Sequence, residues 1–313
     1  MSEAAAMSVL TRVPGVAFAL MLLCTVFALT SAGFVTPANV ANILVQSTIL
    51  LLLALPMTLI IMTEGLDLSM GAVLTFASIS LAIVVISTGS FALALLAAVA
   101  VGLCFGFANG ILVSILDIPP FIATLGTLGI AQGLSLLATD GQSVVGIPRS
   151  IDRIYSGALA GIPLPIVIAT LAYGATHVLL YHTRFGAYIS ALGGNREALK
   201  IAGISVRGTL ILVYLFGGLM AGLAALLMTA RLNSAHPTAG IGMEFDAIAA
   251  VAVGGTSFEH GNGWLFGTLL GVLAVGVLRN GLNLLAVPSS AQVASIGALV
   301  IIALFIDGLR RGQ

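Results

Sequence analysis

Charged side chains are scarce in this sequence of 313 residues. Only 7% of the residues are Asp, Glu, Lys or Arg, and there is a single lysine, Lys200. A globular chain would carry charge on roughly a quarter of its residues. So few charges cannot cover a surface that faces water, and 59% of the residues are hydrophobic. Most of the chain must therefore face lipid or other buried helices, which predicts an all-α, polytopic membrane protein.

Several kinds of chemistry are missing as well. Aromatic residues make up only 6% of the chain and no basic stripe exists, so nothing supports nucleic-acid binding. The lysine follows Leu199 rather than a glycine, which excludes a phosphate-binding Gly-Lys-Ser/Thr loop, and we expect no ATP hydrolysis by this chain. Both cysteines, Cys24 and Cys104, lie inside apolar runs and predict buried packing. We expect no metal or cofactor, because no ligand spacing relates the histidines His177, His182, His236 and His260.

Ten apolar runs divide the chain, and nine of them are long. They occupy residues 14–33, 39–62, 70–87, 91–116, 121–138, 162–181, 208–230, 246–253, 264–287 and 291–306. The run 246–253 is too short to cross a bilayer and predicts a short or re-entrant helix buried within protein. We therefore expect one transmembrane domain over residues 1–313 with about ten membrane helices.

Glycine is abundant, with 37 residues, and recurs at four-residue spacing, which gives a helix a flat face for close contact. The clearest sets are Gly102, Gly106 and Gly110, then Gly263, Gly267 and Gly271, and the pair Gly218 and Gly222. Asn109-Gly110 and Asn280-Gly281 lie in two of these runs, which suggests an internal repeat. A chance resemblance between glycine-rich helices explains so short a match equally well.

The distribution of basic residues predicts an orientation. If the N-terminus is cytoplasmic and each element crosses, the cytoplasmic side holds Arg12, Arg184, Arg196, Lys200, Arg207, Arg310 and Arg311. The outer side then holds Arg149, Arg153 and Arg231. Seven against three favours this arrangement, with both termini in the cytoplasm.

Residues 182–207 form a long polar segment between two apolar runs. Asn195 could cap a short helix that ends at Gly203, which predicts an ordered helix at the membrane surface. Such a helix is a docking site for a water-soluble partner, and an ordinary interfacial loop is the alternative.

Neutral hydrogen-bonding side chains recur in otherwise apolar runs. They are Asn42, Gln46, Asn109, Thr124, Gln132, Asn280, Asn283 and Gln292. Together they suggest a path for an uncharged polar solute, although for each residue a hydrogen bond between helices is the alternative. Charges deep in the runs are nearly absent, which argues against ion coupling. Arg279 lies close to a helix end and could snorkel, and Glu64 and Asp67 could cap the following helix.

Four motifs resemble the permease subunits of ATP-binding cassette importers for monosaccharides. They are residues 63–71 (Thr-Glu-Gly-Leu-Asp-Leu-Ser-Met-Gly), 118–126 (Ile-Pro-Pro-Phe-Ile-Ala-Thr-Leu-Gly), 193–198 with 203–204, and 254–257 with 267–268. The resemblance covers residues 37 to 311. It marks Asp67, Ser69, Gly71, Pro119 and Pro120 as motif residues, whereas Glu64 stands where the family has glycine.

The resemblance implies a subunit of the bacterial inner (plasma) membrane that transports a ribose-like or xylose-like sugar. Its partners would be a second permease chain, membrane lipid, a cytoplasmic ATPase that binds ATP and magnesium, and a periplasmic sugar-binding protein. Residues 182–207 would be the coupling segment, with its contacts made by Asn195, Arg196, Glu197, Ala198 and Gly203. Rival interpretations are a permease for branched-chain amino acids or nucleosides, an ion-coupled secondary transporter, and a purely structural membrane protein.

Overall fold

Thirteen helices and one small hairpin form the computed structural model, which describes residues 3–257 and 261–311 and places side chains for 15–257, 261–299 and 301. The expected helical fold is confirmed. Strands β1 and β2 pair antiparallel. In chain order the elements are α1 (Glu3–Thr30), α2 (Pro37–Met62), α3 (Met70–Thr88), α4 (Phe91–Ser114), α5 (Pro120–Thr139), α6 (Arg149–Ser156), β1 (Ala158–Leu159), β2 (Ile162–Pro163), α7 (Leu164–His182), α8 (Arg184–Gly194), α9 (Arg196–Ile201), α10 (Val206–Leu232), α11 (Met243–Val253), α12 (Leu265–Leu284) and α13 (Ser289–Arg311).

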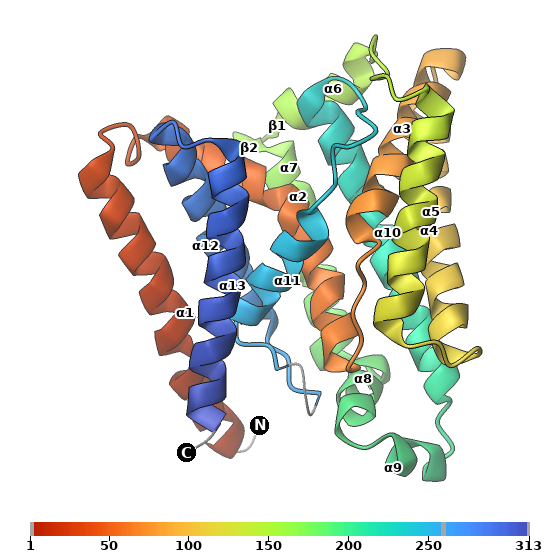
Figure 1. Ribbon diagram of the computed structural model, residues 1–313, viewed down its shortest axis with the longest axis vertical. Helices are drawn as coiled ribbons and strands as arrows, with labels where there is room; N and C mark the ends of the chain where they lie inside the picture. The colour runs from red at the N-terminus through yellow and green to blue at the C-terminus, as the bar shows by residue number, and fades with distance from the viewer. Residues whose placement is uncertain (1–2, 258–260, 312–313) are drawn as a thin grey trace.

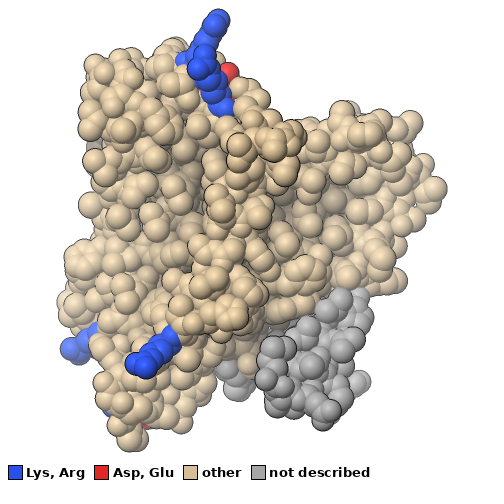
Figure 2. All heavy atoms as spheres, turned by 180° about the vertical axis from the view of Figure 1, so that it is seen from behind, with Lys and Arg blue, Asp and Glu red and all other residues tan. Residues whose placement is uncertain are grey.

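The molecule is a multi-pass membrane protein. Among the described residues, seven helices are long and apolar enough to cross a membrane: α2, α3, α4, α5, α7, α10 and α12. Each of the ten apolar runs coincides with a helix, but the expected count of about ten spans is not confirmed. Figure 2 shows Lys and Arg side chains at the two ends of one face, with a broad uncharged band between them outside the grey atoms. Such a band is what a bilayer covers.

Helix α2 forms the centre of the core. Every residue from Ser47 to Met62 is buried, because α7, α10, α11 and α12 all pack against it. A helix that is apolar on all sides is stable in such a position. In Figure 1, α2 passes between α3, α4, α5 and α10 on one side and α1, α12 and α13 on the other.

The closest helix contacts are made by glycine, as the four-residue spacing predicts. Gly102 of α4 faces Gly218 of α10, and a side chain on either would overlap the carbonyl oxygen of the other. Gly271 of α12 lies against the carbonyl oxygen of Ala250 in α11. Small residues allow helix backbones to approach in this way. Here they join α4 to α10 and the short α11 to α12.

Two elements begin inside the bundle rather than at its ends. Residues 63–69 run back along α2 without helical structure, and α3 starts near mid-height (Figure 1). Helix α11 also starts near mid-height, after a loop that descends from the end of α10 (Figure 1). The predicted short buried helix is thus confirmed, although it starts at Met243 rather than Asp246. Irregular backbone at this depth is tolerated only where protein surrounds it.

We expect Gly218→Leu to destabilise the protein by about 1–3 kcal/mol or more, because the new side chain would overlap backbone of α4. Gly126→Leu on α5 is the matched control, since nothing lies within 4 Å of its added side chain. Thermal unfolding of both variants in detergent measures the difference. Equal melting temperatures would contradict the packing described for α4 and α10.

Candidate functional site

Residues 182–207 fold into the two short helices α8 and α9 rather than one. The Asn195 side chain accepts a hydrogen bond from the Ala198 N–H at 3.0 Å, so it caps α9 as predicted. Gly203 has a φ of 75°, the left-handed conformation that ends a helix, again as predicted. Both helices lie at the end of the molecule where α1 begins and α13 finishes (Figure 1).

Helix α9 is anchored on one side and open on the other. Leu199 is buried in a small apolar cluster with residues of α8 and α10. Ile201 is 87% exposed, and Glu197 and Lys200 form a surface ion pair at 2.7 Å. The residues predicted to contact a partner are all exposed: Asn195, Arg196, Glu197, Ala198 and Gly203. Their role in docking stays a prediction.

The same segment is attached to the end of α2. Gly193 packs under the carbonyl oxygen of Met62, where any side chain would overlap it. Arg196 Nη2 donates to the carbonyl oxygen of Thr63 at 3.5 Å. Closely packed backbone deforms little, so a displacement of α8 and α9 would act directly on the central helix.

Four buried polar side chains form a hydrogen-bonded chain across the bundle. Asp67 Oδ1 accepts from the Ser69 N–H at 2.9 Å and from its hydroxyl at 2.6 Å. Asn109 Nδ2 donates to Ser69 Oγ at 2.9 Å, and Thr127 Oγ1 donates to Asn109 Oδ1 at 2.7 Å. Thr124 is fully buried and donates to the Pro120 carbonyl oxygen at 2.8 Å. The polar groups of Asn109 and Thr124 therefore bond within the bundle, the alternative that the sequence left open.

The other predicted path residues lie apart from this chain. Gln132 of α5 donates to the Pro237 carbonyl oxygen at 2.8 Å. The remaining residues belong to three amide pairs near the start of α2 and the end of α12. These pairs are Asn39 with Asn280 at 2.9 Å, Asn42 with Gln46 at 2.8 Å, and Asn283 with Gln292 at 2.8 Å.

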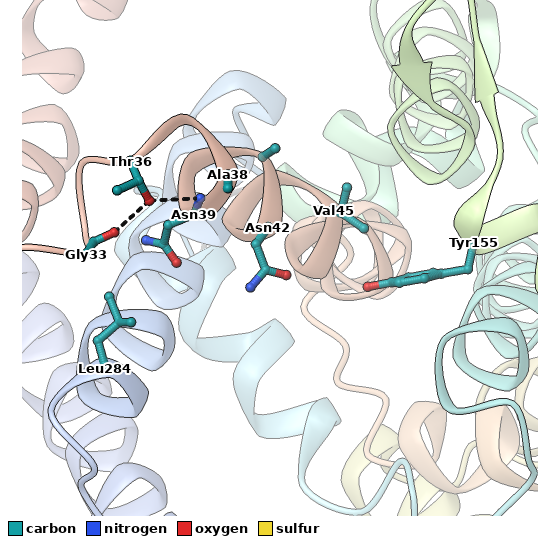
Figure 3. A pocket seen from close by; sticks show the side chains of 9 residues that line it. Gly33, Thr36, Ala38, Asn39, Asn42, Val45, Tyr155 and Leu284 are labelled. Carbon is teal, nitrogen blue, oxygen red and sulfur yellow. Dashed lines mark hydrogen bonds between the residues drawn. The ribbon is translucent and has the colours of Figure 1, made fainter.

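An open cavity of about 570 Å³ lies beside these amides, at the end opposite α9. Figure 3 shows that the start of α2 contributes Asn42 and that Tyr155 of α6 reaches toward the same space. Burial raises the pKa of the Tyr155 hydroxyl, an effect that Arg231 opposes, so the group is a neutral phenol. The lining thus offers uncharged hydrogen-bonding groups. Tyr155 was missed because it lies between the apolar runs 121–138 and 162–181, where no membrane element was predicted.

The motif residues shape the backbone around the polar chain. Ser69 occupies the N-cap position of α3 and makes no capping bond with its own side chain. The Asp67 carboxylate accepts from the Ser69 N–H at 2.9 Å, so Asp67 does bond the start of α3 as predicted, whereas Glu64 makes no such bond among the described residues. Glu64 is exposed just after α2 with a φ of 61°, a conformation that costs glycine least. This φ gives the physical reason for the glycine found here in the resembling family. Pro120 occupies the first turn of α5 after Pro119, where its missing N–H is not needed.

Comparisons with known proteins now identify the family. A family model described as "Branched-chain amino acid transport system / permease component" matches residues 39–304. The chain belongs to this permease family. The ribose import permease protein of Bacillus subtilis (strain 168) is 40% identical over 290 residues, covering 92% of this chain and 90% of the relative. The ribose import permease protein of Escherichia coli (strain K12) is 39% identical, covering 94% and 92%. The D-allose transport system permease protein of the same strain is 35% identical, covering 94% and 91%. No solved structure matches the chain.

The permease buries more charge than its sequence predicts. Asp246 is 5% exposed and pairs with Arg279, so the expectation that Arg279 snorkels to the helix end is wrong. Glu244 is 3% exposed and accepts from the Gly242 N–H at 3.1 Å. Its other carboxylate oxygen lies close to Gly71, where a side chain would overlap it. With Asp67, three carboxylates are buried among the side chains that the structure describes, and the expectation that deep charges are nearly absent is also wrong.

The cysteines and histidines add little to the site. Cys104 is exposed, which contradicts the expected burial, because α4 packs through its glycine face and turns the opposite face outward. Cys24 is half-buried. Within residues 3–257 and 261–311, no group of three His, Cys, Asp or Glu residues is placed to hold a metal ion. His260 lies outside the described residues.

We expect Asn109→Leu to destabilise the permease by about 1–3 kcal/mol, because Ser69 and Thr127 would each lose a buried partner. Asn42→Leu on α2 should change the stability little, since this exposed amide bonds only one turn along its own helix, to Gln46. Melting temperatures in detergent compare the two. A larger loss for Asn42→Leu would mean that the buried chain is not the stabilising element.

Proposed function

We propose that the permease is the membrane-spanning subunit of an ATP-driven importer for a neutral monosaccharide of the ribose or allose type. The observation that carries this proposal is the similarity, at 35–40% identity over about nine-tenths of both chains, to permeases named for ribose and D-allose. The uncharged amide and hydroxyl groups around the cavity support it, because they match the donors and acceptors of sugar hydroxyl groups.

The energy for transport would come from a separate cytoplasmic ATPase that binds ATP and magnesium. Helix α9 is the contact for this ATPase, through the exposed Arg196, Glu197, Ala198 and Ile201. Closure of the ATPase would push α8 and α9 against the end of α2, where Gly193 and Arg196 already touch it. The bundle would then tip from outward to inward opening as rigid bodies.

The orientation and the remaining partners belong to the same proposal. Helix α9 and both chain ends face the cytoplasm, and the cavity beside Asn42 and Tyr155 faces outward in the bacterial inner membrane. A periplasmic sugar-binding protein would deliver the solute to that outer side. A second permease chain, identical or similar, would complete the membrane part.

Branched-chain amino acids, which the family description names, are the second candidate cargo. The ribose and D-allose permeases favour sugar instead, since each is similar to this chain over nearly its whole length. The outer cavity is also lined by neutral hydrogen-bonding groups, which suit sugar hydroxyl groups.

We expect cells that produce the permease with its ATPase and sugar-binding protein to take up D-ribose or D-allose, and Glu197→Arg to abolish this uptake. The substitution places a positive charge beside Lys200 on the exposed face of α9 while leaving the buried Leu199 in place. Radiolabelled sugar uptake at matched membrane abundance measures the effect. Asp152→Arg on α6 makes the same charge change at the opposite end and should leave uptake near the parental rate. Uptake of L-leucine but of neither sugar by the parent would overturn the proposed cargo.

We expect the purified permease alone to hydrolyse no ATP, because its only lysine, Lys200, is in an ion pair on α9 and no phosphate-binding loop surrounds it. Phosphate release from the purified chain, with the assembled importer as the positive control, measures this. ATP hydrolysis by the permease alone would contradict the proposal that a separate ATPase chain supplies the energy.

A further inference from the structure

Asp246 and Arg279 form a charge pair inside the bundle that the proposed function leaves without a role. Asp246 lies in the first turn of α11, which begins near mid-height in Figure 1, and Arg279 is a residue of α12. Arg279 Nη2 donates to Asp246 Oδ2. The aspartate side chain is 7% exposed, whereas the arginine side chain is 43% exposed.

The exposed part of Arg279 constrains what lies beside it. A guanidinium directed toward α11 is held sideways in the bundle rather than extended to the membrane surface. Lipid is an unfavourable neighbour for such a group, and charged side chains at membrane depth face the bundle interior or a water-filled space. The open side of Arg279 therefore faces water, a solute or another polypeptide.

Helix α11 also presents an uncovered aromatic ring one residue before Asp246 in the chain. Phe245 directly precedes Asp246 and is 57% exposed, and Ile241 shortly before it is 58% exposed. Interrupted helices that start at membrane depth are where transporters place their solute sites. A carboxylate, a guanidinium and an aromatic ring thus occur within one turn of such a helix and its neighbour α12.

We propose that Asp246, Arg279 and Phe245 form an inner contact site for the transported solute, a neutral polyhydroxylated ring. The carboxylate would accept from one hydroxyl group of the solute and the guanidinium would donate to an adjacent one. The ring of Phe245 would cover the apolar face of the solute. The inference rests on the proposed sugar transport and adds the place where the solute is held inside the membrane.

The net charge of the site favours this occupant. Asp246 and Arg279 neutralise each other, so the pair offers directional hydrogen bonds without attracting an ion. Conduction also requires weak binding at several places along a path. The amide-lined cavity beside Asn42 and the pair deeper in the bundle are two such places. A second copy of the chain on this face is the alternative occupant, and the first experiment separates the two.

The first experiment measures access of water and sugar to Phe245. In a full-length chain with Cys24 and Cys104 replaced by alanine, Phe245→Cys is treated with a membrane-impermeant thiol reagent in vesicles that contain the assembled importer. Phe107→Cys is the matched control, because Phe107 is similarly exposed, at 48%, on the surface of the membrane-spanning helix α4. We expect Phe245→Cys to be labelled, and D-ribose or D-allose to slow its labelling several-fold, whereas L-leucine does not. Phe107→Cys should stay unlabelled.

Three results of this experiment overturn the inference. They are no labelling of Phe245→Cys, labelling that neither sugar slows, and an oxidant-induced disulfide that joins two copies through this position. The last result would assign the face to a second permease chain. Failure of the parental importer to take up either sugar is a separate result, and it overturns the proposed function itself.

The second experiment separates solute contact from a purely structural ion pair. Asp246→Asn keeps the side-chain shape and is expected to raise the sugar concentration for half-maximal uptake about tenfold, the effect of one lost charge-assisted hydrogen bond. The double exchange Asp246→Arg with Arg279→Asp restores an ion pair in reversed order. We expect it to recover membrane abundance and melting temperature relative to Asp246→Arg alone but not sugar uptake. Recovery of parental uptake by the double exchange would show that the pair only joins α11 to α12.

Discussion

The hydrogen-bonded chain that starts at the Asp67 carboxylate stabilises the bundle where its helical backbone is interrupted. Residues 63–65 still donate their N–H groups to carbonyl oxygens of α2, and the backbone then leaves the helical hydrogen-bond pattern until α3 begins. In this gap, side chains of neighbouring helices bond the backbone instead. The Leu66 carbonyl oxygen accepts from Tyr214 Oη and from Thr124 Oγ1, each at 3.4 Å, while Asp67 bonds Ser69. An unpaired carboxylate or carbonyl would be costly at this depth, so the segment is stable only with these partners in place. The start of α3 and its contacts with α4 and α5 depend on this bonded segment.

This interrupted segment also lies next to the short helices α8 and α9 in the fold. Arg196 bonds the Thr63 carbonyl oxygen, and Gly193 lies under that of Met62. Four residues further along the chain, Asp67 begins the buried polar network. A push on α9 therefore meets a short, closely packed route into the centre rather than a flexible loop. Gly193 keeps this route tight, because it lets the backbone of α8 lie directly against the Met62 carbonyl oxygen.

Features encoded by a few neighbouring residues were predictable from the sequence. The cap at Asn195, the stop at Gly203 and the flat glycine face of α4 follow from local spacing, and the structure has each of them. Partners from distant segments were not predictable. The sequence places Arg279 near a helix end, but in the fold α11 brings Asp246 beside it. The sequence likewise suggests that Asn109 lines a path, whereas its amide bonds Ser69 and Thr127 from neighbouring elements. Hydrophobic periodicity places a residue on a helix but does not choose its neighbour.

The buried carboxylates change the argument about energy coupling. A scarcity of deep charge cannot exclude ion-driven transport here, because Asp67, Glu244 and Asp246 are all buried. The partners of these buried acids are what distinguish them from a proton or ion relay. A relay needs acids that can exchange protons or ions along a path, whereas Asp246 is paired with Arg279 and Asp67 is held by the hydroxyl and N–H of Ser69. Glu244 accepts from the Gly242 N–H through one carboxylate oxygen, whereas its other oxygen lies against Gly71 and has no hydrogen-bond partner among the described residues. The fixed partners of Asp67 and Asp246 fit the proposal of a bundle that moves as rigid bodies and is driven by a separate ATPase at its surface.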